Sequence, residues 1–162
     1  PSNNVGYIGG QDSIMLKTTD GGQTWSPINF TGVTFFPNGS SIVDLKFVSE
    51  LVGYMVVGPY TGTYKTVDGG LTWTEINTLY ACFNSSLYFF DENNGFLGGA
   101  GCFSGEIINK LSGTWSETNL NPLFIQQNGI ITGFDFFDTN LGIASTRADF
   151  SQNRFTLSRP NL

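Results

Sequence analysis

Short apolar runs recur along the whole chain, separated by clusters of Gly, Asn, Asp and Ser. The runs are rich in aromatic and β-branched residues, as in VGYIGG, LKFVSELVGYMVVG and LYFFDENNGFLGGA, and the longer ones carry an acidic turn in the middle. Such residues favour strands, and the intervening residues favour tight turns. The pattern therefore predicts an all-β chain of many short strands.

One motif occurs twice in nearly the same form, as TTDGGQTWSPI from Thr18 and TVDGGLTWTEI from Thr66, about 48 residues apart. A third, degraded copy is NKLSGTWSETNL, where Lys110 lies near the aspartate position and predicts a looser turn. A second element recurs at the same spacing. It consists of an apolar run, an acidic turn, Gly and another apolar run. A period of about 40 to 50 residues is typical of one β-propeller blade.

The second element predicts a hairpin of two strands, a and b. Strand a is expected to end at Phe47, Phe90 and Phe137 in successive repeats. The hairpin glycines, Gly53, Gly95 and Gly142, are expected to supply the backbone freedom that a tight turn requires. The next run is strand c, and the TxDGGxTW turn leads into strand d. Each repeat is thus predicted to be a four-stranded antiparallel meander that is not stable alone.

The repeats are expected at about residues 1–30, 42–77, 85–120 and 131–160, within one domain over residues 1–162. The first repeat offers strands b, c and d, and the last offers a, b and c, so the chain holds about three and a half blades. We expect β-propeller-type blades that are part of a larger propeller. A small closed ring and a head-to-tail homo-oligomer that completes the propeller are the alternatives.

The TxDGGxTW turn resembles the Asp-box, or BNR repeat, of sialidases, sortilin-type receptors, xyloglucanases and photosystem II assembly factors of the Ycf48 type. The strand pattern is most similar to the Ycf48-like branch. In those families the box is architectural, which implies structural roles for Thr18, Asp20, Gly22, Thr24, Trp25, Thr66, Asp68, Gly70, Thr72 and Trp73.

Physical chemistry supports that interpretation of the turn. A short carboxylate at Asp20 or Asp68 is expected to accept backbone N–H groups two or three residues further on. Left-handed conformations are expected at Gly21, Gly22, Gly69 and Gly70. Each indole then packs over its turn, with a local acceptor for the ring N–H. One carboxylate per turn is too few for Ca²⁺, so no metal and no cofactor is expected.

Charge and composition exclude several classes of function. The net charge is −6 and no basic run is present, which disfavours nucleic acid. No apolar stretch approaches the roughly 20 residues of a membrane span. The chain has no His, which removes Ser-His-Asp triads and the usual zinc ligands.

The sialidase resemblance implies Arg residues from separate blades, whereas Arg147, Arg154 and Arg159 share one repeat. We therefore expect no enzyme, and a fragment of a sialidase-like glycosidase is the second alternative.

Cys82 and Cys102 lie at equal distances from Glu92, in the predicted turn of the third a–b hairpin. Residues equidistant from such a turn face each other, which favours a disulfide over two buried thiols. A disulfide implies an oxidising compartment, so the protein is expected to be extracellular or periplasmic.

Candidate binding residues lie in the predicted b–c loops. Aromatic residues are expected at the loop tips, with polar groups nearby: Tyr60, Phe103 and Phe150, then Asp12, Arg147 and Asp149. Such a set of residues suits the binding of an extended peptide or a sugar ring. The alternative is that the aromatic side chains pack beneath their own loops and bind nothing. Because the loops differ in length and chemistry, we expect a protein-binding or assembly scaffold, with a carbohydrate-binding module as the alternative.

Overall fold

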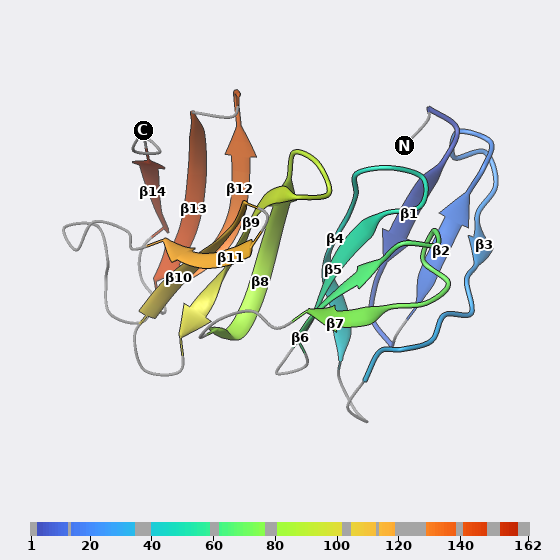
Figure 1. Ribbon diagram of the computed structural model, residues 1–162, viewed down its shortest axis with the longest axis horizontal. Coiled ribbons are helices and arrows are strands. Elements are labelled where there is room, and N and C mark those ends of the chain that lie inside the picture. The colour runs from blue at the N-terminus through green and yellow to red at the C-terminus, as the bar shows by residue number, and fades with distance from the viewer. Residues whose placement is uncertain are drawn as a thin grey trace. The chain divides into compact units, whose positions relative to one another are not determined.

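The computed structural model describes residues 3–12, 14–34, 40–58, 62–76, 81–101, 105–112, 114–118, 129–138, 141–148 and 153–158. These residues form strands and turns, and within them no helix is long and apolar enough to span a membrane. The chain separates into two compact units, Pro1–Asn77 and Thr78–Leu162, shown in Figure 1.

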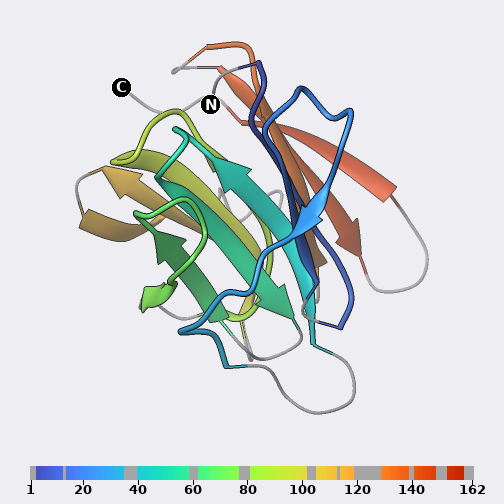
Figure 2. The ribbon, with the colours of Figure 1, turned by 90° about the vertical axis from the view of Figure 1, so that its right-hand side faces the viewer.

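The described part of the first unit forms two antiparallel sheets, in which each strand pairs with the next one along the chain. One sheet has the order β1 (Gly6–Gly9), β2 (Met15–Thr18) and β3 (Ser26–Pro27). The other has the order β4 (Ser41–Phe47), β5 (Gly53–Gly58), β6 (Gly62–Thr66) and β7 (Thr74–Ile76). Figure 2, turned to face this unit, shows the two sheets lying against each other.

The core of the first unit comes from both of its sheets. The buried cluster consists of Met15, Ile42, Phe47, Met55, Val57, Tyr64 and Trp73. The ring of Tyr7 in β1 stacks on that of Phe47 in β4, with ring centroids 3.6 Å apart. β5 is buried at each of its six positions, which explains why its sequence is a continuous apolar run.

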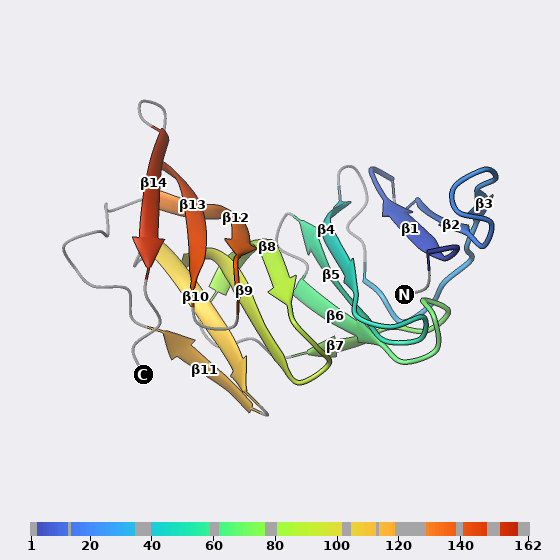
Figure 3. The same ribbon diagram turned by 90° about the horizontal axis from the view of Figure 1, so that it is seen from above.

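The second unit has a four-stranded and a three-stranded sheet among its described residues (Figure 3). The first has the order β8 (Ala81–Phe89), β9 (Asn94–Gly101), β10 (Gly105–Ser112) and β11 (Thr114–Thr118), and the second has the order β12 (Gly129–Phe136), β13 (Gly142–Ala148) and β14 (Asn153–Ser158). Aromatic rings join the two sheets, with Phe96 of β9 stacked on Phe136 of β12 at 4.8 Å. The meander predicted for each repeat is thus confirmed in full for β4–β7 and β8–β11.

The a–b hairpins correct two details of the prediction. Strand a ends at Phe47, Phe89 and Phe136, not at Phe90 or Phe137, and these residues face Gly53, Gly95 and Gly142 across the ladder. Two of the repeats carry a Phe-Phe pair at the end of strand a. Because side chains alternate between the two faces of a strand, only the first Phe of each pair lies on the face of the hairpin glycine, and the prediction took the second. Phe137 lies in the turn and is 70% exposed.

The hairpin glycines also serve a different purpose from the one expected. None of the three has a left-handed φ, so none is required for backbone freedom. Instead, a Cβ atom would lie 2.8 Å from the ring of Phe47 at Gly53, 2.4 Å from that of Phe89 at Gly95, and 2.3 Å from that of Phe136 at Gly142. Glycine is needed because the opposite phenyl ring occupies the space of its side chain.

Each a–b turn is fixed by one short polar side chain at the same position. The Ser49 hydroxyl accepts the Val52 N–H at 2.9 Å, and the Asp138 carboxylate accepts the Leu141 N–H at 2.9 Å. Asp91 accepts the Asn93 N–H at 2.7 Å. These bonds satisfy backbone donors that the strand ladder leaves unpaired.

Candidate functional site

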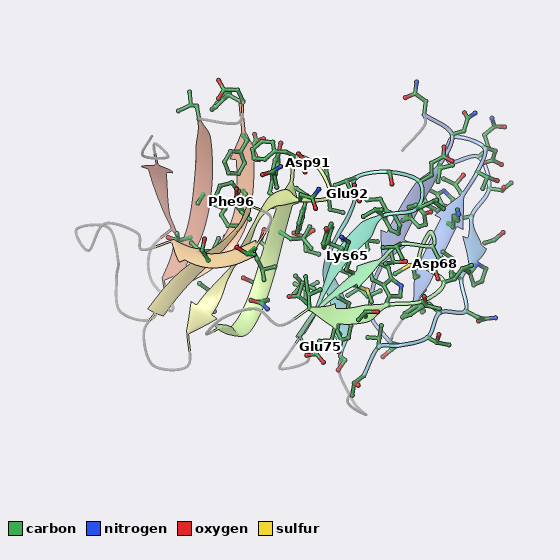
Figure 4. The ribbon with its side chains drawn as sticks, viewed as in Figure 1. Lys65, Asp68, Glu75, Asp91, Glu92 and Phe96 are labelled. Atoms are coloured by element: carbon green, nitrogen blue, oxygen red, sulfur yellow. The ribbon has the colours of Figure 1, made fainter. Side chains whose placement is uncertain are left out.

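The TxDGGxTW turn between β6 and β7 is organised around Asp68, which is labelled in Figure 4. Its carboxylate accepts the Thr72 hydroxyl at 2.5 Å, the Thr72 N–H at 2.9 Å and the Leu71 N–H at 3.0 Å. The Thr66 hydroxyl donates to the same carboxylate at 2.8 Å and accepts the Gly70 N–H at 3.0 Å. Both carboxylate oxygens are therefore occupied by donors of their own turn.

The turn between β2 and β3 repeats this arrangement around Asp20. Its carboxylate accepts the Thr24 hydroxyl at 2.6 Å, the Thr24 N–H at 2.9 Å and the Thr18 hydroxyl at 2.7 Å. Backbone donors two or three residues on were expected, whereas the N–H donor four residues on and the two threonine hydroxyls were not. The recurrence of Thr at both positions in both copies was the signal that could have revealed them.

The glycines of the two turns have the predicted left-handed conformations. Their φ values are 73° and 90° at Gly21 and Gly22, and 75° and 89° at Gly69 and Gly70. The first glycine of each pair donates its N–H to a carbonyl just before strand b, on Asn4 and Leu51 respectively, at 2.9 Å in both cases. The turns are thus anchored to the hairpins of their own sheets.

The two tryptophans bond alike but differ in burial. The indole N–H of Trp25 donates to the Gly22 carbonyl, and that of Trp73 donates to the Gly70 carbonyl, each at 3.1 Å. Trp73 is 3% exposed, whereas Trp25 is 37% exposed. Trp73 lies edge-on to the ring of Phe47 at 6.0 Å, so strand a of its own sheet contributes to its burial.

Hydrogen bonding lowers the pKa of each turn carboxylate. The pKa values of Asp20 and Asp68 fall from 3.8 to about 2, chiefly because of the hydroxyl of Thr24 or Thr72 and then the backbone N–H of the same residue. A carboxylate with so low a pKa is not protonated at neutral pH and cannot serve there as a general acid. Over the described residues, moreover, no group of three or more acidic, His or Cys residues is placed to hold a metal ion.

The third copy of the motif differs from expectation. Lys110 pairs with Phe96 across β10 and β9, as Lys65 pairs with Tyr54 across β6 and β5. Lys110 therefore occupies the lysine position of strand c and not the aspartate position. The β10–β11 ladder continues to Ser112 and Thr114, and the residue between them lies outside the described residues, so the looser turn stays a prediction. Counting back from Trp115 misplaces Lys110, because fewer residues separate strands c and d in this copy than in the other two.

Most of the predicted binding residues, Tyr60, Phe103, Phe150 and Asp149, lie outside the described residues. Asp12 is exposed in the β1–β2 turn, with a left-handed φ of 53°. The backbone of Arg147 lies in β13 opposite Asn153 of β14, and Arg154 follows in β14 opposite Thr146. Arg147 and Arg154 thus share one sheet, and the binding site predicted from the six residues stays a prediction.

The cysteine prediction rested on a symmetric hairpin, which the structure does not keep. Pairing is symmetric from Phe89 and Gly95 to Ser86 and Gly98, but two irregularities then shift the register until Ala81 pairs with Gly101. Cys82 lies within the second irregularity, between Ala81 and Phe83. Cys102 lies outside the described residues, so the disulfide stays a prediction.

These meanders define a class of protein, the all-β proteins built from β-propeller blades. One solved structure to which the chain is similar is described as YCF48 bound to D1 peptide, with a TM-score of 0.65 and 16% sequence identity. The match covers 99% of this chain and 51% of that one, so this chain spans about half the length of the matched protein. No family model and no curated protein matches. The likeness confirms the predicted fold class, with blades of a larger propeller.

Proposed function

We propose that this chain belongs to a protein-binding propeller that acts as an assembly scaffold and catalyses no reaction of its own. The observation that carries the proposal is the likeness in fold to a propeller whose solved structure contains a bound peptide. The turn carboxylates of Asp20 and Asp68 support the absence of catalysis, because their hydrogen-bonding capacity is taken up by their own turns. We also propose that the repeated TxDGGxTW turn is an Asp-box, as its resemblance to that family implies.

The proposed binding surface is the set of loops that follow strand b. β5, β9 and β13 end at Gly58, Gly101 and Ala148, and an aromatic residue lies two positions after each end, at Tyr60, Phe103 and Phe150. The turn after β1 carries Asp12. Aromatic residues are over-represented among the residues that dominate binding energy at protein interfaces.

A carbohydrate-binding module is the second candidate, because aromatic loop residues with neighbouring carboxylates also suit a sugar ring. We further propose that the protein is extracellular or periplasmic, because the disulfide proposed between Cys82 and Cys102 would need an oxidising compartment.

Parallel arrays separate the two candidates. The purified chain is applied to a peptide array and a glycan array, and we expect saturable binding to a subset of peptides and none to glycans. Tyr60→Ala is expected to weaken the peptide binding about tenfold or more. Val67→Ala is the control, since Val67 is an exposed apolar residue in the TVDGGLTW turn. Glycan binding without peptide binding would reverse the order of the candidates, and equal loss in both variants would contradict the proposed surface.

A further inference from the structure

The β8–β9 hairpin contains a chemically labile dipeptide. Asparagine is a thermolabile residue, and it is most reactive before glycine, which has no side chain to hinder attack by its backbone nitrogen. The chain has three Asn-Gly pairs, which begin at Asn38, Asn94 and Asn128, and of these asparagines only Asn94 lies among the described residues. It is exposed at the first position of β9, so water can reach it.

The closed hairpin holds the Asn94 side chain away from this reaction. Its amide Nδ2 donates to both carboxylate oxygens of Asp91, which is labelled in Figure 4, at 3.0 and 2.9 Å. The pKa of Asp91 is lowered, chiefly by the Asn93 N–H and then by the Asn94 amide, so the carboxylate stays ionised and accepts these bonds at neutral pH. Cyclisation requires the side-chain carbonyl carbon to turn toward Gly95, and the two bonds oppose that rotation.

The backbone around the dipeptide is held as well. The Asn94 carbonyl accepts the Phe90 N–H at 2.9 Å. Gly95 pairs with Phe89 of β8 and with Leu111 of β10, so it lies inside the ladder. The Phe89 ring covers this glycine closely, since an added Cβ would lie 2.4 Å from the ring. Attack by the Gly95 nitrogen therefore requires the hairpin to open.

We propose that Asn94 is a deamidation site, at which the reaction occurs when the β8–β9 hairpin opens and then prevents the hairpin from closing again. In the open hairpin, hydroxide removes the Gly95 N–H proton, and the nitrogen attacks the side-chain carbonyl carbon of Asn94. The bond from that carbon to Nδ2 breaks, and the amide nitrogen takes a proton from water and leaves as ammonia. Water then hydrolyses the cyclic imide to aspartate or isoaspartate, so the net change is addition of water and loss of ammonia.

The product lacks the contacts that close the hairpin. A carboxylate at position 94 has no donor for Asp91, so repulsion between like charges replaces two hydrogen bonds. Isoaspartate also lengthens the backbone, which moves Gly95 out of line with the Phe89 ring. Opening is reversible but deamidation is not, so opened hairpins accumulate with time. This inference goes beyond the proposed function, because it uses an a–b turn and none of the loop residues that follow strand b.

The rate of the reaction tests whether the hairpin controls it. The 162-residue chain and a peptide of sequence FDENNGFL, which is residues 90–97, are incubated at mildly alkaline pH. Peptide mapping by mass spectrometry then measures deamidation at Asn94 in each. We expect the reaction in the folded chain to be at least about tenfold slower than in the peptide, because a reaction of the open state follows the population of that state.

Matched variants test the role of Asp91. Asp91→Ala removes the acceptor of the Asn94 amide, so we expect deamidation at Asn94 to become several times faster. Asp138→Ala is the control, because Asp138 has the equivalent position in the β12–β13 turn and the same charge is lost there. This control should react at Asn94 at the rate of the wild-type chain. Thermal unfolding establishes that both variants are folded.

Two further variants test the effect of the product. Asn94→Asp should lower the unfolding midpoint more than Asn94→Ala does, because only Asp adds a charge beside Asp91. The excess should disappear in acid, where both carboxylates are protonated. Hydrogen exchange at the Phe90 amide, which donates to the Asn94 carbonyl, should also be faster in Asn94→Asp than in Asn94→Ala.

Three results would overturn the inference. The first is deamidation at Asn94 that is as fast in the folded chain as in the peptide. The second is an equal rate in Asp91→Ala and Asp138→Ala. The third is equal stability and equal exchange at Phe90 in Asn94→Asp and Asn94→Ala, since the product would then leave the hairpin closed.

Discussion

At the scale of single residues, two carboxylates organise the TxDGGxTW turns through donors that come from their own turns. Thr66 and Thr72 approach Asp68 with their hydroxyl groups, and Thr18 and Thr24 do the same for Asp20. Charge-assisted hydrogen bonds of this kind are stronger than neutral ones. The ionised form is therefore the form that the folded turn stabilises.

The pH dependence of stability follows from these pKa values. The folded pKa of about 2 lies below the ordinary value of 3.8, so the stabilisation is fully present above about pH 4 and is lost as the pH falls through about 2. We expect the midpoint of urea unfolding to fall between pH 4 and pH 2. The double variant Asp20→Asn/Asp68→Asn should be less stable at pH 5 and should lose less stability over that interval.

Asp91 gives the experiment an internal background, because its pKa is also lowered, chiefly by the Asn93 N–H, and it is present in both proteins. The difference between the two curves therefore reports the turn carboxylates. Parallel curves for the wild-type chain and the double variant would contradict the assignment.

At the scale of elements, the repeated unit is a hairpin in which a phenyl ring covers a glycine. The ring and the glycine come from paired positions on neighbouring strands, so the contact fixes the register as well as the packing. A slip of one residue would move the ring to the opposite face of the sheet. The hairpin glycines are therefore positions of steric, not conformational, constraint.

The steric constraint predicts a contrast between two glycine variants. Gly95→Ala places a Cβ 2.4 Å from the Phe89 ring, so we expect the free energy of unfolding to fall by about 1–3 kcal/mol. Gly10→Ala places a Cβ in open space, so we expect no loss, or a gain of up to about 1 kcal/mol. Urea unfolding of both variants measures the difference. Equal stability of the two would show that the ring moves aside without cost.

At the scale of the whole molecule, the chain consists of two compact units, each made from two sheets of one repeated type. Each sheet contributes apolar residues to the core that it shares with its neighbour, as β2 and β5 do through Met15 and Met55. This explains why a single repeat with two apolar faces does not suffice for stability. The cellular compartment of the protein does not follow from this fold, and the state of its two cysteines bears on it instead.

The proposed disulfide between Cys82 and Cys102 tests that compartment. Protein produced in an oxidising environment is expected to gain about two daltons in intact mass on reduction, as two thiols form. A bond that closes a loop of this length stabilises by about 3 kcal/mol, so reduction should also lower the unfolding midpoint. The double variant Cys82→Ser/Cys102→Ser is the control, since neither quantity should then respond to reductant. An unchanged mass for the wild-type chain would contradict both the bond and its implication for location.

The sequence by itself determined the strands, their order within each repeat and the chemistry of the TxDGGxTW turn. These depend on local requirements, since only glycine readily adopts the left-handed conformations at Gly21, Gly22, Gly69 and Gly70, and only a short acceptor such as Asp20 or Asp68 can bond the backbone just ahead of it. Predictions of this kind need no knowledge of distant residues.

Only the tertiary structure decided which Phe of each Phe-Phe pair faces the hairpin glycine, where Lys110 lies, and that the ladder beside Cys82 is irregular. It also decided that Trp73 is buried while Trp25 stays partly exposed, although their local sequences are nearly the same. The reason is that face, register and burial depend on the neighbouring strand. A repeated motif has the same local chemistry in every copy, but it does not have the same neighbours.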